Sequence, residues 1–350
     1  MSLAVFDLPQ WPRFSWDVGA LVTPLVEIRH LQGRFLGRME SLGVSLREEV
    51  AAQALAMDAA AVAAFSGVDA GPADLLDLAI RQVRAGGSRR RAVRSEIEGV
   101  VALLGEASCS YQEPLTTSRL LDWHRELFPK TSAGGAGQWR QSWSGGAPNE
   151  LPSFRIEKEV ETLVQWVETP DGSDGVMRAF TAYGWLMALR PFEKGTKRVA
   201  AALLMRMLAR VEGSSYRFYS LFPQMAVAGG DLEARLDQLK TGGLDLTGWS
   251  AWLLLALSQA LEQAKAVLEP TFKKARFWDD FATAPLNERQ RAVMNLLLDG
   301  DEDKLTTSKW AKIMKCSQDT ALRDIQGLMD LGLLSKDSAG GRSTRYLLAA

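Results

Sequence analysis

In the stretch 189–210, four of the six basic side chains gather around the point where a helix is expected to begin. They are Arg190, Lys194, Lys197 and Arg198. Pro191 and Gly195, which lie among them, predict a turn between two helical runs. The first N–H groups of a helix have no intrahelical partner, and the helix dipole favours negative charge there. The stretch therefore predicts a site for phosphate or another anion, formed by Lys194, Gly195, Thr196, Lys197 and Arg198.

The same loop lacks the side chains that acid–base or metal catalysis needs. Arg190 cannot accept a proton at any relevant pH, so it cannot serve as a general base. Lys194 is a cation where a hard metal such as magnesium would need an oxygen ligand. The two histidines, His30 and His124, lie outside this stretch, and His124 is expected to be exposed or half-buried. No spacing typical of a metal site, a Walker loop or a dinucleotide fingerprint occurs, so the sequence predicts no metal ligands.

The stretch reads LRPFEKGTKRVAAALLMRMLAR and resembles the signature of the Fic (Fido) family, H-P-F-x-[DE]-G-N-G-R-x-x-R. Pro191, Phe192, Gly195 and Arg198 match it. Members of that family transfer AMP or related groups from nucleotides to protein hydroxyls. The resemblance implies a mainly α fold, with a Fic-like helical core and a short β-hairpin flap near residues 134–149.

This sequence departs from the signature at the positions that carry the family's chemistry. The resemblance places the general-base His at Arg190, the magnesium-binding carboxylate at Lys194 and the last Arg at Ala201. The Asn of the phosphate loop is Thr196, and the second Gly is Lys197. It thus implies a scaffold whose reaction centre is dismantled or rewritten, without a catalytic residue and without AMP transfer. Binding of ATP or another nucleotide without magnesium stays open.

The resemblance also implies a self-inhibitory helix in the Ala-rich stretch 47–65. In the branch that this chain resembles, a Glu of that helix pairs with the last Arg of the signature. The corresponding positions here are Ala63 and Ala201. Losing one member of a buried ion pair costs roughly 3–5 kcal/mol, because the other charge is stranded. Joint loss avoids that cost and indicates that there is no activity left to restrain.

A separate unit is predicted from residue 286 to the end of the chain. Helices are expected at 288–298, from about 305, and at 318–331, with Ser317 as an N-cap and Gly332 as the stop residue. A hairpin with Gly340 and Gly341 at its tip follows, and the pattern resembles a winged helix. In DNA-binding members the third helix enters the major groove. The residues expected to contact DNA are Gln318, Thr320, Arg323, Arg342 and Arg345. Asp319 and Asp324 in the same helix favour a docking or dimerisation module instead, and both alternatives stay open.

The composition is that of a globular protein. Of 350 residues, 47% are hydrophobic and 24% are charged, and the net charge is −1, so any basic surface must be local. The two cysteines suit a reducing compartment. No secretory signal opens the chain, and no apolar run approaches the roughly 20 residues that span a bilayer. We therefore expect a cytoplasmic protein with no membrane partner.

Two predictions concern individual helices of the core. Arg206 and Arg210 are four residues apart and are expected to form an exposed pair. A long helix is expected from Thr247 to about Leu268, ending near Pro270.

We expect three parts: an N-terminal helical extension at 1–105, a Fic-like helical core at 106–285 and a winged helix-turn-helix domain at 286–350. The first hypothesis for function is a degenerate Fic/Fido protein without AMP-transferase activity that acts as a binding or regulatory protein, with the winged helix as its output. One alternative is a nucleotide-dependent protein transferase with altered active-site chemistry. The other is a winged-helix DNA-binding transcriptional regulator. A protein partner and a homodimer are compatible with all three.

Overall fold

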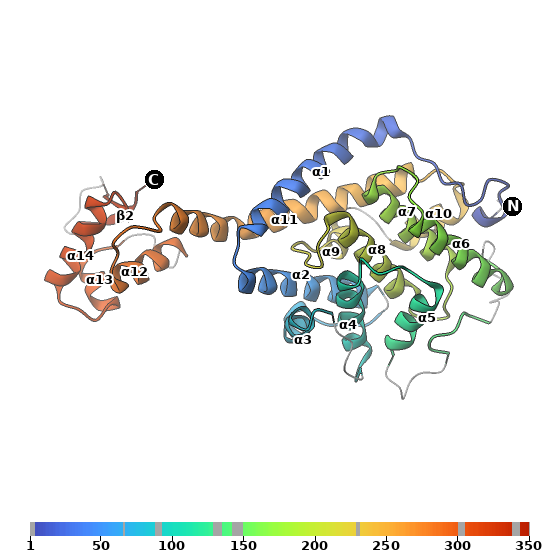
Figure 1. Ribbon diagram of the computed structural model, residues 1–350, viewed down its shortest axis with the longest axis horizontal. Helices are drawn as coiled ribbons and strands as arrows, with labels where there is room; N and C mark the ends of the chain where they lie inside the picture. The colour runs from blue at the N-terminus through green and yellow to red at the C-terminus, as the bar shows by residue number, and fades with distance from the viewer. Residues whose placement is uncertain are drawn as a thin grey trace. The chain divides into compact units, whose positions relative to one another are not determined.

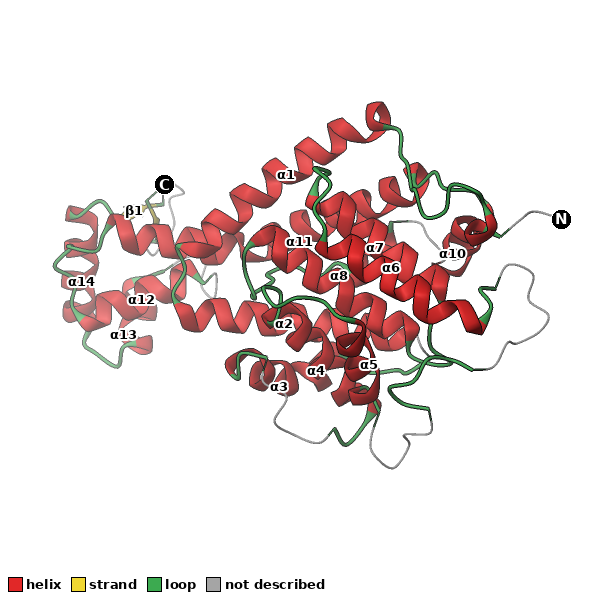
Figure 2. Ribbon diagram, turned by 45° about the vertical axis from the view of Figure 1, so that its right-hand side comes forward, coloured by secondary structure: helices red, strands yellow, loops and turns green. Residues whose placement is uncertain are grey.

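The computed structural model describes residues 4–65, 67–87, 93–128, 135–141, 150–228, 232–299, 305–337 and 344–349. Within these residues there are fourteen α-helices and one sheet of two short strands (Figure 2). The mainly α fold predicted from the sequence is confirmed. Most of the predicted flap, residues 142–149, lies outside the described residues. None of the described helices combines the length and the apolar character that crossing a bilayer requires.

By its contacts the chain divides into two units, residues 1–264 and 265–350. The helices of the first unit are α1 (Val18–Glu40), α2 (Val44–Ala64), α3 (Pro72–Arg84), α4 (Glu96–Cys109), α5 (Thr117–Glu126), α6 (Ile156–Glu168), α7 (Gly175–Leu189), α8 (Thr196–Glu212), α9 (Phe222–Val227) and α10 (Leu232–Thr241), with 3-10 turns η1 (Val5–Asp7) and η3 (Ser153–Arg155). Helix α11 (Thr247–Asp280) runs from the first unit into the second.

Helix α8 is the centre of the first unit. It packs against α2, α4, α5 and α7, which surround it in Figure 1. A helix covered on several sides must be apolar on several faces, and Val199 to Leu204 of α8 are all buried. The turn that leads into α8, which carries the basic residues singled out above, is therefore held by a rigid interior helix.

The prediction that Arg206 of α8 is exposed is wrong, because its side chain is fully buried. It donates to the carbonyl oxygen of Glu113 and lies 3.6 Å from the carboxylate of Glu168. Arg210 is exposed and pairs with the same carboxylate at 3.1 Å. Burial lowers the pKa of Arg206 to about 10, a value that leaves it charged at neutral pH. A spacing of four residues shows that two side chains share a face, but not that the face meets solvent.

The N-terminal segment packs onto the first unit through aromatic side chains. Trp11 and Phe14 meet Trp185 of α7 at ring-centroid distances of 5.7 and 5.3 Å. The backbone N–H of Asp17 donates to the hydroxyl of Thr247, at the start of α11, over 2.7 Å. Residues far apart in the sequence thus share one core.

The prediction that helix α11 ends near Pro270 is wrong, because the helix continues to Asp280. Proline in a helix interior removes one backbone hydrogen bond and costs about 3 kcal/mol. The three aromatic residues beyond it, Phe277, Trp278 and Phe281, pack against the core of the second unit. Their burial offsets the penalty, so a tertiary contact overrides the local signal.

The second unit contains α12 (Glu288–Leu298), α13 (Thr307–Ile313), α14 (Gln318–Asp330), β1 (Leu334–Lys336) and β2 (Tyr346–Leu348). The strands are antiparallel, with Leu334 opposite Leu348, and Leu305 forms a further antiparallel bridge to Tyr346. The Ser317 hydroxyl caps α14 by accepting from the N–H of Thr320. This cap and the predicted order of three helices and a strand pair are confirmed.

Helix α4 approaches the end of α5 so closely that only glycine fits at residue 99. A Cβ there would lie 2.3 Å from the carbonyl oxygen of Leu127. We expect Gly99→Ala to lower the free energy of unfolding by about 1–3 kcal/mol in chemical denaturation, because backbone must move. Gly33→Ala in α1 is the matched control: its Cβ would meet nothing within 4 Å, so the change should stabilise the helix by up to about 1 kcal/mol. Equal effects of the two changes would contradict the close approach.

Candidate functional site

The turn between α7 and α8 reverses the chain in six residues. It contains two left-handed positions, Arg190 with φ 44° and Gly195 with φ 84°. At Gly195 a Cβ would lie 3.3 Å from a side-chain atom of each of three residues: His124 in α5, and Leu127 and Phe128, which follow that helix. Glycine therefore meets both the backbone angle and the tight packing.

Arg190 takes a backbone conformation that costs a side-chain-bearing residue roughly 1–2 kcal/mol. Buried Arg140 stabilises this conformation with two hydrogen bonds. The Nε of Arg140 donates to the carbonyl oxygen of Arg190 over 2.8 Å, and the backbone N–H of Arg140 donates to the carbonyl oxygen of Pro191 over 2.9 Å. The same guanidinium donates to the carbonyl oxygen of Leu151. Burial lowers the pKa of Arg140. The half-exposed side chain of Arg190 itself reaches Glu150, with Nη1 3.3 Å from Oε1.

His124 of α5 lies beneath this turn and is only 4% exposed, so the prediction of an exposed or half-buried side chain is wrong. Its ring stacks on Phe192 with the centroids 3.9 Å apart. Nδ1 accepts from the backbone N–H of Gly137 over 2.9 Å, so the proton of the neutral ring is on Nε2, which donates to the carbonyl oxygen of Lys194 over 2.9 Å. Burial lowers the pKa of His124 to about 4.

Because both ring nitrogens are engaged with backbone, His124 has no lone pair to offer a substrate. It positions the turn and the segment at Gly137, and it is not a general base. His30, the other histidine of the chain, is exposed on α1.

Two of the predicted anion-binding side chains already hold carboxylates. Arg198 is buried and donates from Nη1 to Oε2 of Glu96, at the start of α4, over 2.7 Å. Lys197 donates to the carbonyl oxygen of Phe65, at the end of α2, over 2.9 Å, and to the carboxylate of Glu233 on α10. The acids come from elements about 100 and 36 residues away, so sequence spacing gave no sign of them.

The other predicted residues play different parts. The Thr196 hydroxyl lies 3.3 Å from both the N–H and the carbonyl oxygen of Phe192, which closes the turn on itself. Lys194 is exposed, and its ammonium group forms no ion pair with any described residue. The positive charge of the loop is thus largely neutralised by carboxylates of the same chain, whereas the ammonium group of Lys194 faces solvent.

Across the parts of the chain that the structure describes, no three His, Cys, Asp or Glu side chains gather closely enough to hold a metal ion. Near the turn, the carboxylates of Glu96, Glu150 and Glu233 face guanidinium or ammonium groups. The residues present do not fit the magnesium ion that the resemblance would supply, because Lys194 stands where an oxygen ligand is needed.

The residues predicted to contact DNA lie in the second unit. Gln318, Arg323 and Arg345 are exposed, whereas the half-buried Thr320 has its hydroxyl 2.9 Å from that of Ser317. Arg342 lies outside the described residues. Asp319 and Leu322 are exposed on the same helix, with Leu322 at 49%. Asp324 does not share that exposure: it is buried and pairs with Arg289 at 2.8 Å.

The turn between α7 and α8 lies within a segment that matches a known protein family. The family model described as the Fic/DOC family matches residues 114–208, from just before α5 to the last turns of α8. Residues 114–208 are a Fic/DOC domain. A second model, described as a domain of unknown function (DUF4172), matches residues 5–69, which contain α1 and α2. No curated protein matches the chain.

Several solved structures of Fic proteins align with this chain over much of its length. Fic-1 from C. elegans aligns with a TM-score of 0.50 at 14% identity, covering 73% of this chain and 74% of that chain. A variant of Fic-1 aligns with a TM-score of 0.48 at 16% identity over 73% and 74% of the two chains. A Fic family protein from Desulfovibrio desulfuricans G20 covers 95% of this chain and 97% of its own, at 16% identity and a TM-score of 0.47. At these identities the likeness concerns the fold alone.

Within the Fic domain, the buried histidine leads to a prediction for NMR. The His124 ring should stay neutral, with its proton on Nε2, from pH 8 down to about pH 5, because its pKa is lowered to about 4. His30→Gln leaves a single imidazole, whose 15N shifts then report on His124 alone. A folded pKa below the unfolded value means that this group's stabilisation is present above about pH 6.5 and is lost as the pH falls towards 4. Protonation near pH 6.5, or a proton on Nδ1, would contradict this geometry.

Proposed function

We propose that this chain is a degenerate Fic-fold protein that lacks AMP-transferase activity and acts as a binding or regulatory protein. The observation that supports this most is the state of the α7–α8 turn. Arg190 occupies the place of the general base and Lys194 that of the metal ligand, and three cations of the turn hold carboxylates of the same chain: Arg190 with Glu150, Lys197 with Glu233 and Arg198 with Glu96.

These ion pairs oppose the binding of a nucleotide. A phosphate that approached the start of α8 would compete with Glu96 for Arg198, whose side chain is only 4% exposed. Glu96 is 41% exposed, so the pair is screened on that side and its strength lies between that of a surface pair and a buried one. An intramolecular carboxylate needs no loss of translational freedom, and this favours the closed arrangement.

The positions of the family's inhibitory pair support the same proposal. Ala63 and Ala201 are both about 1% exposed, so a charged side chain at either position alone would be buried without a partner. The end of α2 is attached to the turn by a different contact, that of Lys197 with the carbonyl oxygen of Phe65.

For the second unit we propose a winged helix that serves as the output module. The order α12, α13, α14, β1, β2 and the bridge between Leu305 and Tyr346 support this assignment. Exposed Gln318, Arg323 and Arg345 favour DNA, whereas exposed Leu322 and Asp319 on the same helix favour a protein partner. A cytoplasmic location is part of this proposal.

One observation favours the alternative, a nucleotide-dependent transferase with altered chemistry. Lys194 is exposed beside the N-terminus of α8 and forms no ion pair with the described residues. Its ammonium group would supply positive charge to a phosphate where the family uses a metal ion.

Labelling with ATP tests the proposal. We expect no label on this protein or on lysate proteins, with or without magnesium, because loss of a general base alone lowers rates by roughly 10²–10⁴-fold. Arg198→Ala is the control for labelling that depends on the turn. Magnesium-dependent label that this control loses would overturn the proposal. Label that persists with a chelator and is lost in Lys194→Ala would establish the alternative.

Salt dependence tests the DNA-binding role of the full chain. If Arg345 contacts a phosphate, Arg345→Ala should make the slope of log affinity against log salt shallower by about one unit, because one fewer counterion is released. Arg276→Ala is a matched control, since Arg276 is exposed on α11 and is not among the predicted contacts. Fluorescence anisotropy with genomic fragments gives both slopes. No binding at low salt, or the same slope in both variants, would favour the docking module.

A further inference from the structure

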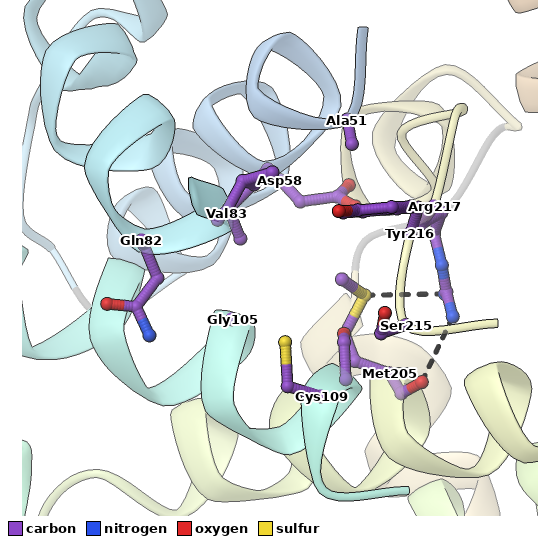
Figure 3. Close-up of a pocket in the computed structure, with 12 residues that line it drawn as sticks. Ala51, Asp58, Gln82, Val83, Gly105, Cys109, Met205, Ser215, Tyr216 and Arg217 are labelled. Carbon is purple, nitrogen blue, oxygen red and sulfur yellow. Dashed lines mark hydrogen bonds between the residues drawn. The ribbon is translucent and has the colours of Figure 1, made fainter. Parts of the chain in front are cut away.

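A small pocket lies apart from the α7–α8 turn, between α2, α3, α4, the body of α8 and the segment 213–222 that follows α8 (Figure 3). It has about 30 Å³ of free space, which is room for one or two water molecules. Most of its wall is apolar, formed by Ala51, Leu55, Val83 and Met205 among others. The acid in this wall is Asp58 of α2, and its carboxylate is directed toward the segment that carries Arg217 (Figure 3).

Asp58 is fully buried and only partly hydrogen-bonded. Oδ1 accepts from the backbone N–H of Phe222 over 3.0 Å, whereas Oδ2 is buried without a hydrogen-bond partner. A carboxylate offers about four lone-pair sites, so an ionised Asp58 would leave the charge on Oδ2 without a donor from the protein. Burial raises the pKa of Asp58 to about 7, although the charge of Arg217 and backbone N–H groups act in the opposite direction.

Arg217 also lines this pocket; both of its Nη atoms contact Met205, whereas its Nε has no hydrogen-bond partner. Its Nη2 donates to the carbonyl oxygen of Met205 over 3.0 Å and lies 3.8 Å from Oε2 of Glu212. Glu212 is also buried and accepts from the hydroxyl of Tyr219. Arg217 and Glu212 balance each other's charge, so a charge on Asp58 would be surplus.

The other elements around Asp58 supply no further cation among the described residues that line the pocket. Helix α3 contributes the uncharged Gln82, and α4 contributes Cys109, whose pKa is raised to about 11 by burial and by the charge of Glu106. The segment after α8 adds the Tyr216 ring, and α9 adds the N–H of Phe222. A proton is therefore the simplest way to remove the surplus charge.

We propose that Asp58 holds a proton in the folded chain below neutral pH, and that release of this proton is a switch that loosens the contact between α2 and the segment 213–222. A buried charge without a partner must be hydrated, and movement of this segment away from α2 would bring water to Oδ2. Across the same contact, the Ser220 hydroxyl donates to the carbonyl oxygen of Ala54 over 3.1 Å.

The switch reaches the Fic domain through α2. This helix ends at Ala64, and the carbonyl oxygen of the next residue, Phe65, accepts from Lys197 in the first turn of α8. Movement of α2 on release of the proton would change that contact. The proposal does not depend on the absence of AMP transfer.

Infrared spectroscopy tests the protonation directly. At pH 6 in heavy water, the wild-type protein should show the carbonyl band of one protonated carboxyl group that Asp58→Asn lacks, and the band should disappear as the pH is raised through about 7. Asp245→Asn is the control, since Asp245 is exposed and its pKa is lowered by hydrogen bonds from Thr247, so the band should persist. If the band is absent at pH 6, or persists in Asp58→Asn, the proposal is wrong.

The pH dependence of stability gives a second measurement. A folded pKa above the unfolded value of 3.8 means that the stabilisation is fully present below about pH 4 and is lost as the pH rises to about 7. Across this window the folding constant of the wild type should fall relative to Asp58→Asn by close to tenfold per pH unit. A ratio that does not change with pH would overturn the proposal. Should Asp58→Asn not fold, the carboxyl 13C shift of Asp58 in the wild type decides: titration near pH 7 supports the proposal, and titration below pH 5 refutes it.

Hydrogen exchange tests the switch itself. Above pH 7, backbone amides in the segment 213–222 and in the second half of α2 should exchange faster in the wild type than in Asp58→Asn, beyond the common effect of pH on exchange. Amides of α6, which does not line the pocket, serve as the internal reference. Equal protection of the segment in both proteins, while Asp58 titrates, would show that the proton is bound but is not a switch.

Discussion

The turn between α7 and α8 depends on the hydrogen bonds of one neutral imidazole, that of His124, which lies beneath it. His124 binds the carbonyl oxygen of Lys194 with one nitrogen and the N–H of Gly137 with the other, while its face covers Phe192. A charged ring would have no acceptor nitrogen for Gly137. The turn also contains the left-handed Arg190, whose carbonyl oxygen is held by buried Arg140. The shape of the loop is thus maintained by groups beneath it, independently of what its exposed side chains do.

This independence explains how the turn keeps its shape although several of its residues differ from the family signature. Three basic side chains of the turn meet acids from α4, from α10 and from Glu150, which precedes α6. A loop with several cations at a helix N-terminus would repel itself without anions, whether they belong to a ligand or to the protein. Here the protein supplies them. The charges of the turn are thus largely balanced within the chain.

The sequence was informative where a feature depends on residues close together in the chain. The bend at Gly195, the cap at Ser317 and the order of elements in the second unit all follow from local backbone chemistry. It was uninformative where burial or a distant partner decides. Nothing near Arg206 shows that it is enclosed, nothing near Pro270 shows that aromatic packing carries the helix past it, and no spacing links Arg198 to Glu96. Nothing in the Ala-rich sequence around Asp58 shows that the helix buries it completely.

The two segments that match separate family models do not form separate structural modules. Helix α2 of the DUF4172 segment packs against α8 of the Fic domain, and Trp11 of the same segment packs against Trp185 of α7. A recombination event that exchanged only residues 5–69 would remove the partners of both helices and expose apolar surface on each side. The two segments are therefore expected to be inherited together, and a homologue that lost one of them would need a replacement cover for α7 and α8.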